Sequence, residues 1–128
     1  MRHLGIDFGT KRVGLALSDE SGVMAFPYAV IPNDAKLVQA LEAIIAKEGV
    51  QAVVIGHSLD KSGRPNAIHQ AVEALITDLT LACGVPITLH PEQFTTQEAI
   101  RASGRHKEID AAAATIILNS YLTQHSYD

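Results

Sequence analysis

Three acidic residues lie where predicted strands end or a predicted helix begins. Asp7 lies in the apolar run Leu4–Phe8, Glu92 follows the run Ile87–Leu89, and Asp110 opens a helix. A carboxylate in an apolar segment is costly to bury unless it is paired, hydrogen-bonded or bound to a metal ion. Clustered carboxylates need a cation to stay ionised, and Mg²⁺ and Mn²⁺ prefer all-oxygen ligands. If the three acids converge, they suit metal-dependent phosphodiester hydrolysis.

Each acid also has a simpler interpretation. Asp7 could face solvent from an alternating strand, Glu92 could be a solvated loop residue, and Asp110 could only complement a helix dipole. Two features favour the site. Gly9–Lys11 form a tight turn that places a hydroxyl and a cation next to Asp7, a combination suited to phosphate. The alanines Ala111–Ala114 leave the last helix with little bulk, so that it can lie close to a sheet, with Asp110 on its inward side.

Most of the cations fall in predicted loops or near element ends. The formal net charge of −4 argues against binding nucleic acid over the whole surface, but it allows a local basic rim. The loop from Gly56 to Pro65 either binds a phosphate backbone or is an ordinary connection between elements. His57 and His106, in predicted loops beside the candidate functional segments, could also contact phosphate. The residues expected to bind nucleic acid are Lys11, Arg12, Lys61, Arg64, Arg105 and Lys107.

The apolar pattern predicts an α/β fold. Strands are expected over residues 4–8, 13–18, 24–31, 52–55 and 86–89. Helices are expected from Asn33 or Asp34 to Gly49, from about 68 to Gly84, over 97–102 and over 107–123. Pro27 predicts that the third strand is at an edge or bulged. The order β-β-β-α-β-α-β-α implies a mixed sheet with helices on both faces.

Bulk properties set the class of protein. The 128 residues fit one domain, 1–128, with no apolar run long enough for a membrane span and no signal peptide. The single cysteine, Cys83, fits a reducing cytoplasmic setting and a buried, inert thiol. With no partner for Cys83 and no suitably spaced histidine pair, zinc is not expected.

Several segments resemble one known family. The segment Gly5–Asp19 is similar to the opening motif of the YqgF/RuvX family, bacterial ribonuclease H-like proteins described as Holliday junction resolvases and as nucleases that mature the 5′ end of 16S ribosomal RNA. The likeness continues in Val53–Gly56, Asp60–Gly63, Glu92–Thr96 and Lys107–Leu118. It spans nearly the whole chain in order, and the first and last segments are the most specific.

The resemblance implies a ribonuclease H-like five-stranded mixed sheet and phosphodiester hydrolysis with Mg²⁺ or Mn²⁺. The family's acids fall on Asp7, Glu92 and Asp110, and Lys11 and Arg12 would line the substrate side of the first hairpin. Structured RNA is the expected partner and branched DNA the alternative. No membrane partner is expected, and the chain would act as a monomer or weak homodimer.

The chain departs from the family pattern in two places. Pro91-Glu92-Gln93 replaces the usual Asp-Glu-Arg, and Gly56-His57-Ser58 replaces Gly-Leu-Pro. The three acids remain, but the cation at position 93 is missing, which leaves open a non-catalytic factor bound to RNA or the ribosome. An ATP-binding module is a further alternative, because Ile6–Thr10 is similar to a kinase phosphate loop, but such proteins need two lobes.

Overall fold

The computed structural model describes residues 1–9, 11–58, 67–92 and 106–125, with only the backbone described for residues 57–58, 67–69, 91–92, 106–110 and 124–125. The strands are β1 (His3–Phe8), β2 (Arg12–Ser18), β3 (Ala25–Pro32), β4 (Ala52–Ser58) and β5 (Ile87–Glu92). The helices in these ranges are α1 (Leu37–Glu48), α2 (Ala67–Cys83) and α4 (His106–His125).

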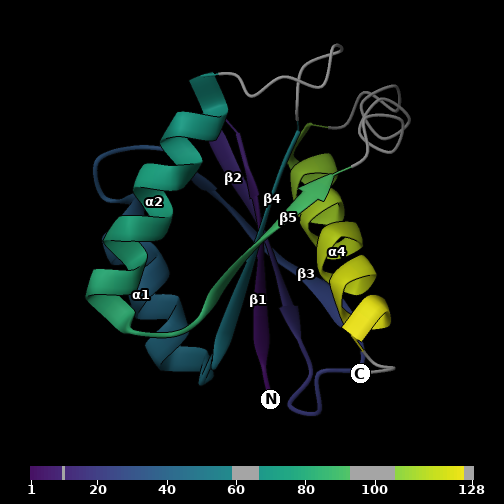
Figure 1. Cartoon of the computed structure of the whole chain (residues 1–128). Coiled ribbons are helices and arrows are strands. Elements are labelled where there is room, and N and C mark those ends of the chain that lie inside the picture. Colours follow the sequence, from purple (N-terminus) through teal and green to yellow (C-terminus); the bar gives the residue numbers. More distant parts are fainter. Residues whose placement is uncertain (10, 59–66, 93–105, 126–128) are drawn as a thin grey trace.

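The five strands form one mixed sheet in the order β3-β2-β1-β4-β5. β1 pairs antiparallel with β2, and β2 with β3, whereas β1–β4 and β4–β5 are parallel (Figure 1). The predicted fold class and the predicted order of elements are therefore confirmed. Since β1, β4 and β5 run in the same direction, their carboxyl ends meet at one end of the sheet, where α4 begins (Figure 1).

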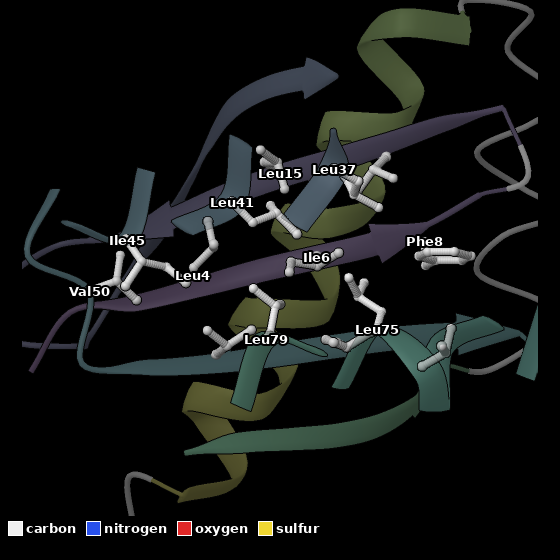
Figure 2. Close-up of a cluster of buried hydrophobic side chains, with 14 residues drawn as sticks. Leu4, Ile6, Phe8, Leu15, Leu37, Leu41, Ile45, Val50, Leu75 and Leu79 are labelled. Atoms are coloured by element: carbon white, nitrogen blue, oxygen red, sulfur yellow. The ribbon is translucent and has the colours of Figure 1, made fainter. Parts of the chain in front are cut away.

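Helices cover both faces of the sheet, as the sequence predicts. Alternation along β1 sends Leu4, Ile6 and Phe8 into the core shared with α1 and α2 (Figure 2). The intervening position, Gly5, faces α4 instead. The second core, between the sheet and α4, combines three alanines with larger aliphatic side chains of the sheet and the helix: Ala16, Ala25, Ala114, Val54, Ile117, Leu118 and Leu122.

The edge strand β3 shows both features that Pro27 predicts. β3 is the outermost strand on its side of the sheet, and its register with β2 shifts between Leu15 and Ala16. Leu15 pairs with Ala29 and Ala16 with Pro27, which leaves an extra residue on the β3 side. Proline is tolerated here because an edge strand has a neighbour on only one side.

Helix α1 ends as expected but begins later. Gly49 closes it in the left-handed conformation with φ 67°, which a glycine adopts without strain. At the other end the N-cap is Lys36, with no side-chain capping bond, so the prediction of Asn33 or Asp34 as the cap is wrong. The carboxylate of Asp34 accepts a hydrogen bond from the Lys36 N–H at 2.9 Å and forms a turn ahead of the helix.

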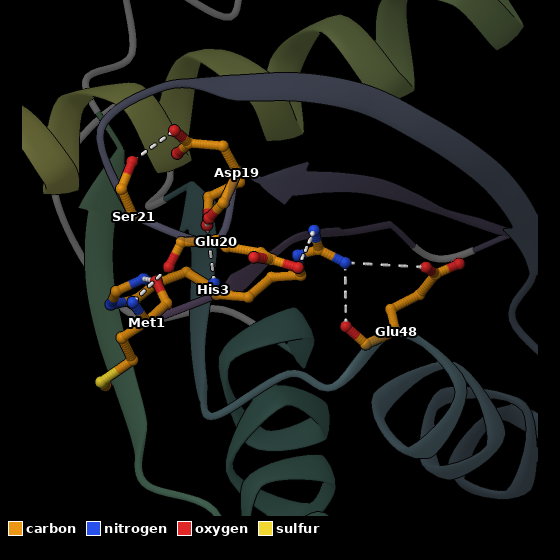
Figure 3. Close-up of polar contacts among 8 residues, drawn as sticks. Met1, His3, Asp19, Glu20, Ser21 and Glu48 are labelled. Atoms are coloured by element: carbon orange, nitrogen blue, oxygen red, sulfur yellow. Dashed lines mark hydrogen bonds and ion pairs between the residues drawn. The ribbon is translucent and has the colours of Figure 1, made fainter.

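The β2–β3 turn follows the end of β2 that pairs with Leu4, so it lies at the end of the sheet opposite to Asp7. Asp19 organises this turn (Figure 3). Its carboxylate accepts hydrogen bonds from the Ser21 hydroxyl at 2.5 Å and from the N–H groups of Val23 and Met24 at 2.8 and 3.2 Å. These bonds, the Ser21 bond most strongly, lower the pKa of Asp19 from 3.8 to about 2. The turn is thus held by an ionised carboxylate.

Two predicted segments fall outside the described residues: most of the loop after the central strand, and the short helix over 97–102. The central strand itself is longer than predicted, since Gly56 to Ser58 belong to β4 rather than to the loop. Among the described helices, none combines the length and apolarity needed to span a membrane.

Candidate active site at the carboxyl end of β1

Asp7 lies between two glycines. In the sheet register it pairs with Gly14 of β2 on one side and with Gly56 of β4 on the other. Residues paired in register share a face, so no neighbouring strand places a side chain directly beside the Asp7 carboxylate. Asp7 is half buried, and its face is the one that α4 covers rather than an open solvent face. The interpretation of Asp7 as a residue on an open polar face is therefore disfavoured.

Helix α4 lies unusually close to this face. A Cβ at Gly5 would be 2.8 Å from Leu118 Cβ and 3.1 Å from the Ala114 carbonyl oxygen. A Cβ at Gly56 would be 2.4 Å from Ile117 Cδ1. Ala114, Ile117 and Leu118 are all buried. The helix lies close to the sheet, as the sequence predicts, but the closest contacts involve Ile117 and Leu118 as well as Ala114. They occur where Gly5 and Gly56 leave the sheet without side chains.

The direction of α4 carries Asp110 toward Asp7. Tyr121 contacts the His3 ring at a centroid distance of 5.8 Å, while Ala114 lies over Gly5, so α4 runs antiparallel to β1. Asp110 is one turn before Ala114, a rise of about 6 Å. Asp7 is two residues after Gly5, about 6.6 Å further along the strand. The two steps lead to the same end of the sheet, so the backbone at position 110 lies near the level of Asp7.

Glu92 lies at that end too, but on a strand. The sequence places it in a loop just beyond the strand, whereas the structure makes it the last residue of β5, paired with Ser58. His90 is in register with Gly56 and hence with Asp7. Position 92 is two residues further along β5, so it lies on the same face as position 90. Along the strands it is about 6.6 Å past the level of Asp7, and across the sheet it is two strand spacings, roughly 10 Å, away.

The β1–β2 turn brings cations to the same end. Lys11 is exposed and Arg12, the first residue of β2, is half buried. The side-chain N–H of Asn33 donates to the Gly9 carbonyl at 2.7 Å, and its backbone N–H donates to the Lys11 carbonyl at 3.0 Å. Of the residues predicted to bind nucleic acid, Lys11 and Arg12 are the two whose side chains the structure describes.

The remaining predicted contacts are described less fully. Lys61, Arg64 and Arg105 lie outside the described residues. The structure describes only the backbone of three others. His106 and Lys107 lie in the first turn of α4, and His57 lies near the end of β4.

The donor set suits a hard cation. Among side chains that the structure describes, no three acids, histidines or cysteines gather into a metal-binding group, and the side chains of Glu92 and Asp110 are not among them. The backbone positions bring three carboxylate-bearing residues and no cysteine to one end of the sheet. Carboxylate oxygens are the ligands that Mg²⁺ and Mn²⁺ prefer.

Sequence reasoning misses the residues that shape this site without reacting in it. Gly14 and Gly56 flank Asp7, but the sequence places the first within a strand and the second at the start of a loop. A glycine inside a strand often marks a close approach of another backbone, which is the signal that could have identified both. Asn33 is predicted to cap a helix, and its bonds to the β1–β2 turn depend on pairing that local sequence does not reveal.

The sequence matches the family model described as "RuvX: Holliday junction resolvase" over residues 1–124. Proteins named "Putative pre-16S rRNA nuclease" are similar over nearly the whole chain. The one from Desulforudis audaxviator is 35% identical, covering 95% of this chain and 94% of the relative. The one from Opitutus terrae is 38% identical, covering 97% and 92%.

Solved structures share the fold at low sequence identity. RuvC of T. thermophilus in complex with a Holliday junction substrate superposes with a TM-score of 0.61 at 17% identity, covering 98% of this chain and 96% of that one. The fowlpox virus resolvase, also bound to Holliday junction DNA, gives a TM-score of 0.61 at 10% identity, covering 97% and 98%. These neighbours confirm the ribonuclease H-like fold.

Proposed function

The chain belongs to the RuvX family, and on that premise we propose that it is a metal-dependent endonuclease that hydrolyses phosphodiester bonds in maturation of the 5′ end of 16S ribosomal RNA. In support, the relatives that match nearly the full length are named as nucleases of pre-16S rRNA. The protein would act in the cytoplasm as a monomer or weak homodimer.

The observation that carries the proposal is the position of Asp7. Its carboxylate lies at the carboxyl end of β1 between Gly14 and Gly56, on the face that α4 covers. The carboxyl ends of parallel strands are where α/β folds gather functional groups. Glu92 at the end of β5 and Asp110 at the start of α4 belong to the same end, which supports a shared role for the three acids.

In this proposal, Asp7, Glu92 and Asp110 hold Mg²⁺ or Mn²⁺. The bound cation would supply an activated water and stabilise the oxygen that leaves the phosphorus. The chain's own contribution is to fix the three carboxylates on rigid elements, two strands and a helix, so that their geometry does not depend on a loop. Lys11 and Arg12 would bind substrate phosphates from the adjoining turn.

A four-way DNA junction is the second candidate substrate. Two structural neighbours are resolvases bound to such junctions, and the family model carries the same description. The third candidate, a non-catalytic RNA- or ribosome-associated factor, is favoured by Pro91 and Gln93 on either side of Glu92, where the family has an acid and a cation.

The test is a cleavage assay with Mg²⁺ or Mn²⁺ on three substrates: a precursor of the 16S 5′ end, single-stranded RNA and a four-way DNA junction. We expect preferred cleavage of the precursor RNA. Asp7→Asn and Asp110→Asn should each lower the rate by more than about 100-fold, because losing even an outer-shell partner of a metal ligand costs about 10–100-fold. Asp78→Asn, at an exposed acid on α2, is the matched control and should cleave normally.

The outcomes separate the candidates. Preferred cleavage of the junction would replace the rRNA substrate with DNA and leave the site unchanged. Cleavage that survives both Asp7→Asn and Asp110→Asn would overturn the assigned residues. Binding of the precursor without cleavage in either metal would favour the non-catalytic factor.

A further inference from the structure

The turn that carries Lys11 and Arg12 is held from a third strand. Asn33 directly follows β3, whose last residue, Pro32, pairs with Arg12. From there Asn33 uses two donors: its side-chain N–H bonds the Gly9 carbonyl at 2.7 Å and its backbone N–H bonds the Lys11 carbonyl at 3.0 Å. The two carbonyls lie on either side of position 10, so one residue fixes both halves of the turn.

The turn leaves little room to adjust on its own. A Cβ at Gly9 would be 2.5 Å from the Arg12 carbonyl oxygen, so the backbone folds back on itself at this point. Asn33 is half buried, and Lys11 on the outside of the turn is exposed. The bonds from Asn33 therefore hold the inner side of a tight turn whose outer side presents a cation.

We propose that Asn33 is a positioning residue for nucleic-acid binding, which holds the Gly9–Arg12 turn so that Lys11 and Arg12 meet substrate phosphates beside Asp7. The inference rests on the proposed function, because it assumes that this end of the sheet binds nucleic acid. Asn33 does not touch the substrate; it acts through the turn. A turn whose carbonyls are tied presents its cations in one arrangement, so less conformational freedom is lost when phosphate binds.

The test measures binding without cleavage. Affinities of the precursor RNA and of the four-way DNA junction are determined by fluorescence anisotropy with a chelator present, across a series of salt concentrations. Asn33→Ala should weaken binding by roughly 3–10-fold, the equivalent of one hydrogen bond. Its slope of log affinity against log salt should also become shallower, by up to about one unit for each phosphate that the turn no longer neutralises.

A double-mutant comparison separates positioning from a general loss of structure. In a variant carrying Lys11→Ala and Arg12→Ala, the further change Asn33→Ala should weaken binding no more, because the groups through which it acts are gone. Asp34→Ala is the matched control. Its carboxylate bonds the Lys36 N–H at the start of α1, so its loss should leave binding unchanged.

Asn33→Leu keeps the approximate shape of the side chain and removes the donor without adding a charge, and it carries the same comparison if Asn33→Ala does not fold. Two outcomes would overturn the role of Asn33. One is that Asn33→Ala binds as tightly as the wild type. The other is that Asn33→Ala weakens binding as much in the variant lacking Lys11 and Arg12 as it does in the wild type. If the unchanged protein binds neither nucleic acid, the proposed function fails first.

Discussion

The close approach of α4 to the sheet can be tested at Gly56. In Gly56→Ala the new methyl group would be 2.4 Å from Ile117 Cδ1 and 2.9 Å from its Cγ1 and Cγ2. Ile117 is only 1% exposed, so its side chain has no open space into which to move. Overpacking of this kind costs about 1–3 kcal/mol, and we expect Gly56→Ala to lower the free energy of unfolding by that amount.

The clash involves only side-chain atoms, so truncating the partner should relieve it. Ile117→Ala alone should cost about 2–5 kcal/mol because it leaves a cavity. In the Ile117→Ala background, Gly56→Ala should be neutral or stabilising, because alanine restricts the unfolded chain by about 0.5–1 kcal/mol relative to glycine. The double-mutant cycle should therefore show a favourable coupling of about 1–3 kcal/mol.

Gly5 provides the matched comparison. A Cβ there meets Leu118 Cβ and the Ala114 carbonyl, and truncating Leu118 to alanine removes neither atom. Gly5→Ala should therefore be destabilising in both backgrounds, with or without Leu118→Ala. Urea unfolding followed by circular dichroism gives all the values, since the chain has no tryptophan to report by fluorescence. An equal cost for Gly56→Ala with and without Ile117→Ala would refute the close packing of α4.

Two further predictions concern ionisable groups. Because the pKa of Asp19 is lowered to about 2, its carboxylate stabilises the fold fully above the ordinary value of 3.8. The stability gap between the wild type and Asp19→Ala, measured by urea unfolding, should thus shrink as the pH falls from about 4 to about 2; a constant gap would contradict the turn geometry. The Tyr28 hydroxyl donates to Glu48 at 2.9 Å, and this bond raises the pKa of Tyr28 above its ordinary 10.0, with burial and the charge of Glu48 adding to it. Its stabilising effect is full below that ordinary value and is lost as the pH rises through the higher folded pKa. In Glu48→Gln, Tyr28 should ionise at a lower pH than in the wild type, as measured by tyrosinate absorbance. An unchanged titration would exclude the hydrogen bond between Tyr28 and Glu48.

Local patterns predict the elements that position the site. Alternation of Leu4, Ile6 and Phe8 identifies β1 and leaves Asp7 on the other face, and the alanines of the last helix predict its close packing. The predicted end of the last strand, at residue 89, is wrong, because β5 continues to Glu92. Pro91 looks like the end of a strand, but β5 is an edge strand, where proline is tolerated, and pairing continues to Glu92.

What local sequence cannot give is register. That Gly14 and Gly56 flank Asp7 follows from which residues pair between strands, and these pairings join positions far apart in the chain. The same holds for Asn33, whose partners Gly9 and Lys11 lie on the first hairpin. An asparagine shortly before a helix has a sufficient local explanation as a cap, so its longer-range bonds are invisible without the fold.

The proposed chemistry requires that Asp7, Glu92 and Asp110 share one metal site. A crystal soaked with Mn²⁺, with the metal located by its anomalous scattering, tests it most directly. We predict Mn²⁺ at the carboxyl end of β1 with a carboxylate oxygen from each of the three acids at about 2 Å. Mn²⁺ bound elsewhere, or bound at this end without one of the three carboxylates, would contradict the claim.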